Sequence, residues 1–488
     1  MNPRSASLLL LLTALFFSGC LVGPNYRTPA AKVPTVWSEK PAGGAAAKPI
    51  ESERWWQTFK DPVLNALIDR AVQSNLDLRI AEARLREARA ERDVTAAGLW
   101  PAINSSGSYS RTHNSQYGPV VQAALAAAGS AGSKAPSIKQ QQDLYQVGFD
   151  ASWEIDVFGG IRRSVEAADA TVAAVQENQR GVLVSLLAEV ARNYVELRGA
   201  QRQIIITQDN IKTQQDTLYL TRSRYNAGLT SEIDVLRQEA QLTSTQSQIP
   251  TLESSVKRSI HSLGILLGKE PGALLEELSK NAPIPGSPPE VPVGLTSDLL
   301  RRRPDVRSAE RELAAATAQI GVAIADLFPS FSLTGSAGRQ SEKFSDLGLG
   351  ASKFWNVGPS IHLPIFEGGK ILANIKVQNA RQEQALALYE QTILTSLGDV
   401  ENALVDYSTE QIRRRSLAES VAANLRSVTL SNELYTRGLI DFLNVLDAQR
   451  SLYASQFQLV QSEQNVALNL VVLYKALGGG WEAYAGKQ

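Results

Sequence analysis

The sequence predicts a mainly α-helical, internally duplicated protein that also contributes strands to a membrane β-barrel. Three observations predict this fold class. The chain repeats itself, two very long segments carry a seven-residue apolar repeat, and four short segments alternate apolar and polar residues. Each copy reads in the order helix, strand, strand, long helix, tight turn and helix.

The overall composition is that of a folded protein without a basic surface. Of the 488 residues, 43% are hydrophobic and 20% are charged, so the chain can bury a sizeable core. Its 49 Lys and Arg residues balance its 49 Asp and Glu residues. Because nucleic-acid binders gather phosphates with an excess of basic side chains, we expect no nucleic acid among the partners.

The first element is a signal peptide, predicted over residues 1–19. A basic residue, Arg4, precedes an apolar run from Leu8 to Phe17 that only Thr13 interrupts. A helix of this length spans roughly 15 Å, whereas a bilayer-spanning helix needs roughly 20 residues. The run is therefore too short to be a permanent membrane anchor.

The signal peptide ends in small residues directly before Cys20, an arrangement that resembles a bacterial lipobox. The resemblance implies cleavage before Cys20 and a covalent lipid, diacylglycerol and an N-acyl chain, on that residue. Cys20 is the only cysteine, so no disulfide can stabilise the exported protein. Similar lipoproteins that stay at the inner membrane carry an aspartate after the cysteine. Because Leu21 stands there in this chain, we expect outer-membrane sorting.

The duplication appears when the chain is compared with itself at two spacings. A shift of 228 residues aligns the first part of each copy, and a shift of 210 aligns the second part, so the first copy holds 18 extra residues between them. Identical pairs include Asp77 with Asp305, Glu82 with Glu310, Leu85 with Leu313, Pro101 with Pro329, Tyr225 with Tyr435, Gly228 with Gly438, and Leu236 with Leu446.

These spacings divide the mature chain into five segments. Residues 20–60 form a lipidated N-terminal extension, 61–280 the first repeat, 281–296 a linker, 297–480 the second repeat and 481–488 a tail. The linker contains five prolines, which remove backbone donors and exclude a continuous helix. A stretch rich in Ala and Gly, 41–49, is expected to tether the lipid to the body.

The long helix of the first copy shows the clearest periodicity. From Gly160 to Gly228 there is no proline, so one helix there would run roughly 100 Å. A seven-residue apolar repeat keeps one seam facing a neighbour, and glutamines beside it suit a surface that also meets water. The repeat comprises Leu183, Val190, Leu197, Ile204, Ile211, Leu218 and Tyr225, with Gln201, Gln208 and Gln215 beside it. In the second copy Arg414 interrupts the corresponding repeat.

Four strands are predicted from alternation, at about 102–113, 145–157, 330–338 and 355–366. A soluble half-buried sheet shows the same period, but no helix is left over to cover these strands. A tilted membrane strand needs roughly 9 to 11 residues, and the smallest useful barrels have about eight strands. Four strands cannot close, so several chains must share one barrel; this argument alone allows two, three or more copies.

The whole pattern resembles the TolC-like outer-membrane efflux proteins, specifically the lipoprotein branch that serves resistance-nodulation-division pumps. The resemblance covers nearly all of the mature chain. It rests on motifs at 22–29 (VGPNYRTP), 55–62 (WW, F and DP), 300–307 (LRRRPDVR), 327–329 (LFP), 446–452 (LDAQRSL) and 474–481 (YKALGGGW).

The resemblance implies a homotrimer in which four strands per chain make a 12-stranded barrel, continued by a periplasmic α-barrel of coiled-coil helices. It implies an outer-membrane channel that passively conducts drugs, toxic compounds or metals. A periplasmic membrane-fusion adaptor and an inner-membrane resistance-nodulation-division pump would be its partners, with outer-membrane lipid around it. The linker and chain ends would form a belt, and residues 113–142 a mobile outer loop.

The resemblance also implies a periplasmic gate at Leu443 and Asp447, which are one helical turn apart on one face. Threefold symmetry would turn Asp447 into an acidic ring that repels anions and attracts cations. The first copy has Ile233 and Arg237 at these positions, so only the second hairpin would supply the ring. The alternative for Asp447 is an ordinary solvated helix charge.

Two further features are expected near this gate. Tyr435 matches a tyrosine that ties the hairpin to its neighbour in the closed state, although packing in the helical seam is an alternative role. The two turns match the region where the adaptor docks, although glycine is also the ordinary helix C-cap there. These turns are Gly228, Leu229, Thr230 and Gly438, Leu439, Ile440.

Three other functions compete with the channel. An enzyme has little support, because His113, His261 and His362 are isolated, without metal-ligand spacing or a phosphate loop, and no catalytic residue, metal or cofactor other than the lipid is expected. A structural coiled-coil lipoprotein that spaces the envelope would not explain the amphipathic strands. A type I protein-secretion exit duct would carry secreted proteins instead of small molecules. The lipobox favours small-molecule efflux over protein secretion.

Overall fold

The computed structural model describes residues 20–30, 33–38, 45–46, 53–115, 117–118, 122, 141–286, 291–294 and 296–484. The predicted signal peptide, most of the 113–142 loop and much of the 41–49 stretch lie outside these residues. The described chain forms two compact units. We call Met1–Arg27, Arg89–Thr171 and Leu313–Gln384 the sheet unit, and Thr28–Ala88, Val172–Glu312 and Ala385–Gln488 the hairpin unit.

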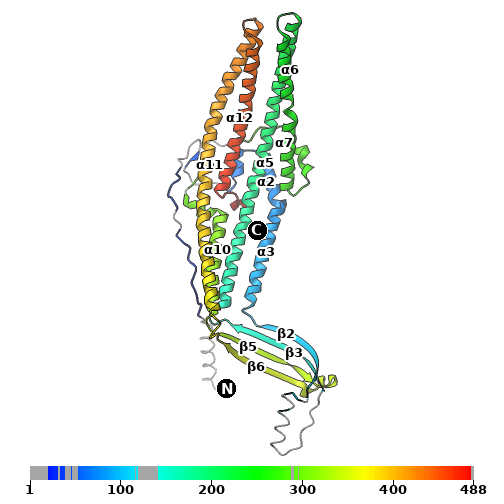
Figure 1. Ribbon diagram of the computed structural model, residues 1–488, viewed down its shortest axis with the longest axis vertical. Coiled ribbons are helices and arrows are strands. Elements are labelled where there is room, and N and C mark those ends of the chain that lie inside the picture. Colours follow the sequence, from blue (N-terminus) through cyan, green and yellow to red (C-terminus); the bar gives the residue numbers. More distant parts are fainter. Residues whose placement is uncertain are drawn as a thin grey trace, which may run out of the picture. The chain divides into compact units, whose positions relative to one another are not determined.

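Four long strands make the sheet unit an antiparallel sheet in the order β2-β3-β5-β6 (Figure 1). The strands are β2 (Ala102–His113), β3 (Gln141–Ile155), β5 (Ser330–Ser341) and β6 (Lys353–His362). β3 begins four residues before the predicted second strand, and β6 ends four residues before the predicted fourth, where Pro364 removes a backbone donor. The strands β2 and β6 are the two edges.

The two longest helices, α5 (Gly160–Asn226) and α11 (Lys370–Thr436), each have 67 residues and run through both units. Each begins directly after glycines with positive φ, Gly159 and the pair Gly368–Gly369, which turn strand into helix. At 1.5 Å per residue each helix is about 100 Å long. The predicted single long helix in each copy is therefore correct.

Each long helix turns back into a shorter partner (Figure 1). In the first copy the partner is split into α6 (Glu232–Gln246) and α7 (Ile249–Leu266), with Pro250 in the first turn of α7. In the second copy α12 (Phe442–Ala476) is unbroken. Before the strands, each copy has a 22-residue helix, α3 (Leu76–Ala97) or α10 (Pro304–Ala325).

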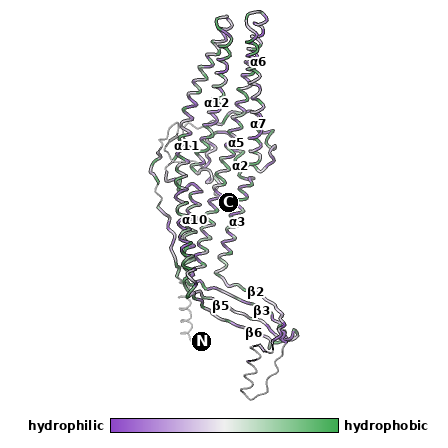
Figure 2. The backbone as a smooth tube through the Cα atoms, viewed as in Figure 1, coloured by the Kyte–Doolittle hydropathy of each residue, from purple (hydrophilic) through white to green (hydrophobic). Residues whose placement is uncertain are grey.

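Shorter elements complete the hairpin unit and the rim of the sheet. They are β1 (Ala45–Ala46), η1 (Trp55–Phe59), α2 (Pro62–Ser74), η2 (Pro271–Leu274), α8 (Leu275–Leu278), β4 (Val291–Pro292), η3 (Thr296–Asp298), α9 (Leu299–Arg302), η4 (Phe344–Gly348), η5 (Gly350–Ser352) and η6 (Glu482–Tyr484). Figure 2 shows hydrophilic residues along all the long helices. Among the described helices, none has an apolar stretch long enough to cross a bilayer.

The core of the hairpin unit joins the chain ends to the helices. α2 buries Leu64, Leu67, Ile68 and Ala71, the spacing of one helix face. Its N-cap is Asp61, whose side chain accepts hydrogen bonds from the next turn and from the Tyr194 hydroxyl at 2.8 Å. The aromatic pair before α2 packs on the C-terminal region, because Trp55 stacks on Tyr474 and Trp56 on Tyr484.

Packing between distant segments adds contacts to the linker and changes one expectation. In the linker, Val291 and Val293 are fully buried in the core and β4 pairs with β1. Gln201 does not meet water: it is buried, and its amide donates to the Leu278 carbonyl oxygen, a contact that the heptad pattern does not encode.

The two repeats close on themselves in the same way. Asn75 precedes α3 and donates its side-chain amide to the carbonyl oxygen of Leu266, the last residue of α7, at 2.9 Å. Arg303 precedes α10 and donates to the carbonyl oxygen of Ala476, the last residue of α12, at 3.1 Å. These contacts are related by the two sequence shifts, 228 and 210. The start of each repeat is thus held to its end.

Candidate functional site

The strand register sorts the sheet into two faces of opposite character. Phe149 of β3 lies opposite Ala337 of β5, which lies opposite Trp355 of β6, and the other residues of this face follow at every second position. This apolar face comprises Ile103, Tyr109, Tyr145, Val147, Phe149, Ala151, Trp153, Ile155, Phe331, Leu333, Ala337, Trp355, Val357, Pro359 and Ile361. Much of it is exposed in the chain; Trp355, for example, is 79% exposed.

The other face is almost entirely polar. It carries hydroxyl and amide side chains from all four strands, such as Ser332 and Ser360, whose hydroxyl oxygens lie 2.6 Å apart. A sheet with one exposed apolar face and one polar face suits the boundary between lipid and a water-filled pore. The unpaired edges β2 and β6 exclude a closed barrel from one chain.

Cys20 is an exposed free thiol whose neighbours are fixed to the sheet unit. The Val22 amide donates to the Phe158 carbonyl oxygen at 3.2 Å, just beyond the end of β3. Arg163, which is only 1% exposed, donates from its guanidinium to the carbonyl oxygens of Val22 and Gly23 and to Oδ1 of Asn25, at 2.7 to 3.2 Å.

Gly23 is required at its position in this segment. It has a φ of 88°, and a Cβ there would collide with the backbone of Gly321. The motif that follows the cysteine is therefore a docking sequence. It holds Cys20 within a few residues of the point where the sheet ends.

The second hairpin tip presents both predicted gate residues on one exposed surface. Leu443 and Asp447 are exposed on the same face of α12, one turn apart. On the opposite face an apolar cluster forms, which we call the tip cluster. It consists of Tyr435, Ile440, Phe442, Val445 and Leu446.

Tyr435 belongs to the tip cluster and also contacts the first hairpin. Its ring lies 5.5 Å from that of Phe442, and the Arg224 guanidinium of α5 lies 4.6 Å from the ring centroid. Arg224 also donates to the Thr436 carbonyl oxygen at 3.4 Å. The Tyr435 hydroxyl is buried and has no hydrogen-bond partner among the described residues. Tyr435 thus packs within its own hairpin and also contacts Arg224 of the first hairpin.

Among the described residues, the first hairpin tip shows no such cluster. Ile233 is exposed, and Arg237 lies 3.9 Å from Asp234. Asp234 also accepts a hydrogen bond from the Thr230 hydroxyl at 2.6 Å, which closes the turn. Both turns contain a glycine with positive φ, Gly228 or Gly438, followed by an exposed leucine, Leu229 or Leu439. Ile440 differs from Thr230, because it packs against the tip cluster.

Sequence reasoning missed Arg224. The position that corresponds to it in the second copy is Leu434, and this difference in charge was the only available signal. The pairing of Arg224 with Tyr435 joins two different helices that are far apart in the chain, so a local pattern could not reveal it. The predicted site residues of the second tip are otherwise brought together as expected from their spacing.

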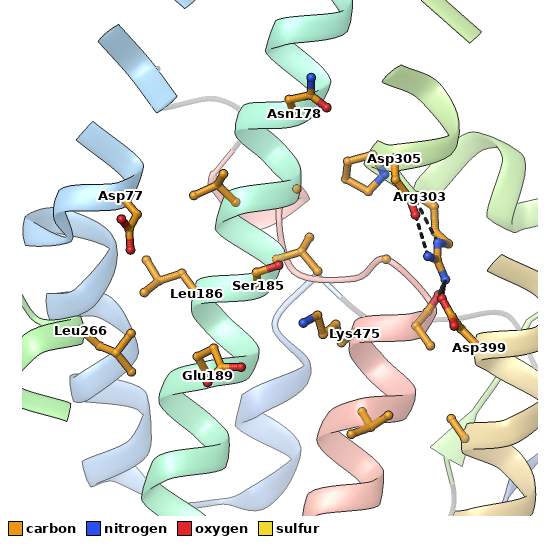
Figure 3. A pocket seen from close by; sticks show the side chains of 18 of the residues that line it. Asp77, Asn178, Ser185, Leu186, Glu189, Leu266, Arg303, Asp305, Asp399 and Lys475 are labelled. Carbon is orange, nitrogen blue, oxygen red and sulfur yellow. Dashed lines mark hydrogen bonds and ion pairs between the residues drawn. The ribbon is translucent and has the colours of Figure 1, made fainter. Parts of the chain in front are cut away.

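A cavity of about 860 Å³ in the hairpin unit lies where the ends of the repeats meet. Figure 3 shows Arg303 between Asp305 and Asp399, to which it donates at 2.6 and 3.0 Å. Burial lowers the pKa of the Arg303 guanidinium, but the bonds to Asp305 and Asp399 outweigh this effect, and the pKa lies above its ordinary value. The charge of Arg303 is thus satisfied within the chain.

In the described part of the chain, no group of His, Cys, Asp and Glu side chains is placed to hold a metal ion.

A two-faced, open-edged sheet and long paired helices in one chain define a subunit of an export channel in the bacterial envelope. The chain belongs to the outer membrane efflux protein family, whose model matches residues 67–269 and 295–479.

Relatives resemble it over almost their whole length. Nodulation protein T of Rhizobium leguminosarum bv. trifolii is 33% identical over 474 residues, 97% of each chain. Toluene efflux pump outer membrane protein TtgC of Pseudomonas putida is 33% identical over 482 residues, 98% of this chain and 96% of TtgC. Cation efflux system protein CusC of Escherichia coli O157:H7 is 31% identical over 490 residues, 99% of this chain and all of CusC.

Solved channels share the fold. The outer-membrane channel OprN is 37% identical with a TM-score of 0.85, covering 95% of this chain and 100% of OprN. The open state of the Neisseria gonorrhoeae MtrE outer membrane channel is 28% identical with a TM-score of 0.82. The match covers 95% of this chain and 99% of MtrE. The predicted family, fold class, efflux function and outer-membrane location are confirmed, and members of this family are channels.

Proposed function

We propose that this chain is the outer-membrane exit duct of a tripartite efflux pump and works as a homotrimer. One observation carries the proposal: a four-stranded sheet with one apolar face and two unpaired edges. In lipid, each unpaired backbone group costs several kcal/mol, so β2 and β6 need partners. Because strand direction alternates across the sheet, β6 of one copy meets β2 of the next in antiparallel orientation.

The helices support the same assembly. Exposed large apolar side chains follow α11, where a neighbouring copy would cover them. They include Leu394, Val405, Ile412, Leu425 and Leu430. Three copies give the 12 strands that the family resemblance implies, which is enough to enclose a pore.

The duct is passive and receives its cargo from other proteins. An inner-membrane resistance-nodulation-division pump selects small molecules, and a periplasmic membrane-fusion adaptor contacts the turns at Gly228–Thr230 and Gly438–Ile440. The relatives are named for toluene, cation and other efflux systems, which fits a duct that is not itself selective for one compound. Leu443 and Asp447 narrow its periplasmic end, and Tyr435 holds that end closed.

Cys20 carries the lipid in this proposal, and its exposed thiol next to a docked segment supports the assignment. We expect labelled palmitate to be incorporated into the wild-type protein in bacteria and to be lost in Cys20→Ser. A matched variant, Ser18→Ala, keeps a small residue at that position and should keep the label. Label that persists in Cys20→Ser would exclude Cys20 as the attachment site.

The channel itself is tested with purified protein in planar bilayers. We expect cross-linking to trap trimers and the reconstituted protein to show discrete conductance steps. A monomeric protein that never conducts, under conditions where the fold is intact by circular dichroism, would contradict the proposed function.

A further inference from the structure

The apolar face of the sheet contains a groove near the end that is not joined to the α-helices. Each strand meets an α-helix at one end, and Lys353, the first residue of β6, lies at the other end. The groove has a volume of about 710 Å³, and most of its lining residues belong to the apolar face by their register. Gly107 leaves space in it, because a Cβ there would meet no atom within 4 Å. Phe149 and Trp355 line it with exposed aromatic rings.

The groove is lined by basic side chains and by no acidic ones. Its charged lining residues are Arg339 and Lys353, which lie directly opposite each other in the register of β5 and β6. Like charges in such positions repel each other. Nη1 of Arg339 donates to the carbonyl oxygens of Leu347 and Gly348 at 3.1 and 2.6 Å. Its Nε and Nη2, like Nζ of Lys353, have no partner among the described residues. An anchored guanidinium with a free edge beside a second cation suits an anion.

The strands themselves do not supply that anion. On the apolar face of the four described strands the acidic side chain is Asp143. Arg111 donates to both of its carboxylate oxygens, at 2.6 and 2.9 Å. Because Asp143 is engaged in this way, an anion that balances Arg339 and Lys353 must come from outside the strands.

The height of this basic pair on the sheet matches the edge of a lipid layer. Eight residues of β3 separate Ile155, close to the start of α5, from Val147, which lies opposite Arg339. At roughly 3.3 Å per residue and a strand tilt of about 40°, this separation is about 20 Å across the membrane. The apolar band of a membrane barrel is about 25 Å tall, so Arg339 lies near its outer edge. From that depth Lys and Arg side chains reach the lipid headgroups.

We propose that this groove binds an acyl chain of a membrane lipid whose phosphate is held by Arg339 and Lys353. The inference rests on the proposed function, because it takes the apolar face as the face toward lipid. The acyl chain lies over Gly107, beside Phe149 and Trp355. The phosphate accepts hydrogen bonds from Nε and Nη2 of Arg339 and from Nζ of Lys353, which relieves their repulsion. A soluble phosphate has no acyl chain to place in the groove, so the occupant is a lipid.

The first test is native mass spectrometry of the full-length protein in detergent, titrated with dioleoylphosphatidic acid. The matched probes are dioleoylglycerol, which lacks the phosphate, and glycerol phosphate, which lacks the acyl chains. We expect the lipid with both parts to bind about tenfold more tightly than either probe, or better. Equal binding of dioleoylglycerol would overturn the phosphate contact, and equal binding of glycerol phosphate would overturn the lipid as the occupant.

Two variants test the two parts of the site. Arg339→Gln combined with Lys353→Gln should weaken the binding of phosphatidic acid by about tenfold and leave that of dioleoylglycerol unchanged. Lys353→Gln alone, which breaks no contact within the described chain, should cause part of this loss. Gly107→Leu fills the groove and should weaken both lipids, whereas Gly335→Leu, on the same face outside the groove, is the control. Wild-type affinity in the double variant or in Gly107→Leu would overturn the proposal.

The second test places the site in a bilayer. Trp355 is exposed and lines the groove, so a brominated acyl chain bound there quenches its fluorescence. In phosphatidylcholine vesicles, a small fraction of dibrominated phosphatidic acid should quench Trp355 more than the same fraction of dibrominated phosphatidylcholine. The variant Trp355→Phe gives the background from the other tryptophans.

The two tests separate this inference from the proposed function. Equal quenching of Trp355 by the two brominated lipids, in a protein that conducts in planar bilayers, would overturn the lipid site alone. A wild-type protein that never conducts would contradict the proposed function, on which the lipid site rests.

Discussion

The two hairpin tips have the same length and backbone plan but opposite character. In the second tip Tyr435 is 4% exposed and Leu446 is 1% exposed; their counterparts in the first tip, Tyr225 and Leu236, are 42% and 55% exposed. Two aligned positions differ in this way: Phe442 covers the second tip where Glu232 stands in the first, and Ile440 packs against the tip cluster where Thr230 stands in the first. Duplication has thus produced one self-packed tip and one open tip.

The repeats also differ in where they carry acid. The first repeat places Asp150 and Glu154 on the polar face of the sheet and Arg237 at its tip, whereas the second places Ser360 on the sheet and Asp447 at its tip. The two repeats therefore differ in charge at these aligned positions. A duplicated gene can divide tasks in this way, because the shared backbone leaves the side chains free to diverge.

The largest expected difference in stability is between matched variants at the starts of the two repeats, at Arg303 and Asn75. Arg303→Gln should lower the free energy of unfolding by about 3 kcal/mol, because it removes charge-assisted hydrogen bonds to the half-exposed Asp305 and Asp399 and to the Ala476 carbonyl oxygen. Asn75→Ala should cost only about 1 to 2 kcal/mol, because it removes neutral hydrogen bonds. Denaturation in detergent, followed by circular dichroism, checks both. Equal losses of unfolding free energy would show that the Arg303 and Asn75 contacts stabilise the two repeats equally, although one is charged and the other neutral.

At the tips, Phe442→Ala should open the tip cluster. Loss of a buried phenylalanine costs about 3 kcal/mol, so amide hydrogen exchange over 435–446 should accelerate by about 100-fold. The matched change in the first copy, Glu232→Ala, should leave exchange over 225–236 nearly unchanged. Equal acceleration in both tips would refute the division into packed and open tips.

A smaller effect is expected from Arg224→Leu, which removes the contact between the tips. A cation over an aromatic ring contributes about 0.5 to 2 kcal/mol, so exchange near Tyr435 should accelerate by about 2- to 30-fold. Arg224→Lys should retain part of the protection. If Arg224→Leu and wild type exchange alike, the contact does not hold the tips together.

The smallest effect concerns the proposed gate. Asp447→Ala, with or without Leu443→Ala, should raise single-channel conductance by about twofold, because it removes charge and bulk from a narrow ring. Arg237→Ala, the counterpart in the first tip, should leave conductance as it is. Unchanged conductance and selectivity in Asp447→Ala would remove this residue from the gate and leave it as a solvated helix charge.

Periodicity made most of the fold predictable. The duplicated helices and strands follow from apolar spacing, because a long helix and an alternating strand each repeat one local rule many times. Packing between distant segments did not follow. The burial of Val291 and Val293 was hidden by the surrounding prolines, and the burial of Gln201 depends on a carbonyl group 77 residues away.

The candidate site was also predictable only where it depends on spacing along one helix or strand. Leu443 and Asp447 could be placed on one face from their spacing alone, but the partner of Tyr435 could not, because Arg224 belongs to another helix. The alternation of apolar and polar residues along the strands predicted the polar face of the sheet. The basic pair Arg339 and Lys353 on the apolar face became apparent only when the register aligned their strands.

The docking of the segment after Cys20 has a consequence for the order of biogenesis. Its binding site is made by Phe158 and Arg163 of the first repeat and by Gly321 of the second. During export the N-terminus emerges first, yet its site is incomplete until the chain as far as Gly321 has followed. The segment after Cys20 therefore cannot complete its docking until the second repeat has followed as far as Gly321, so the first residues made are among the last to reach their final place.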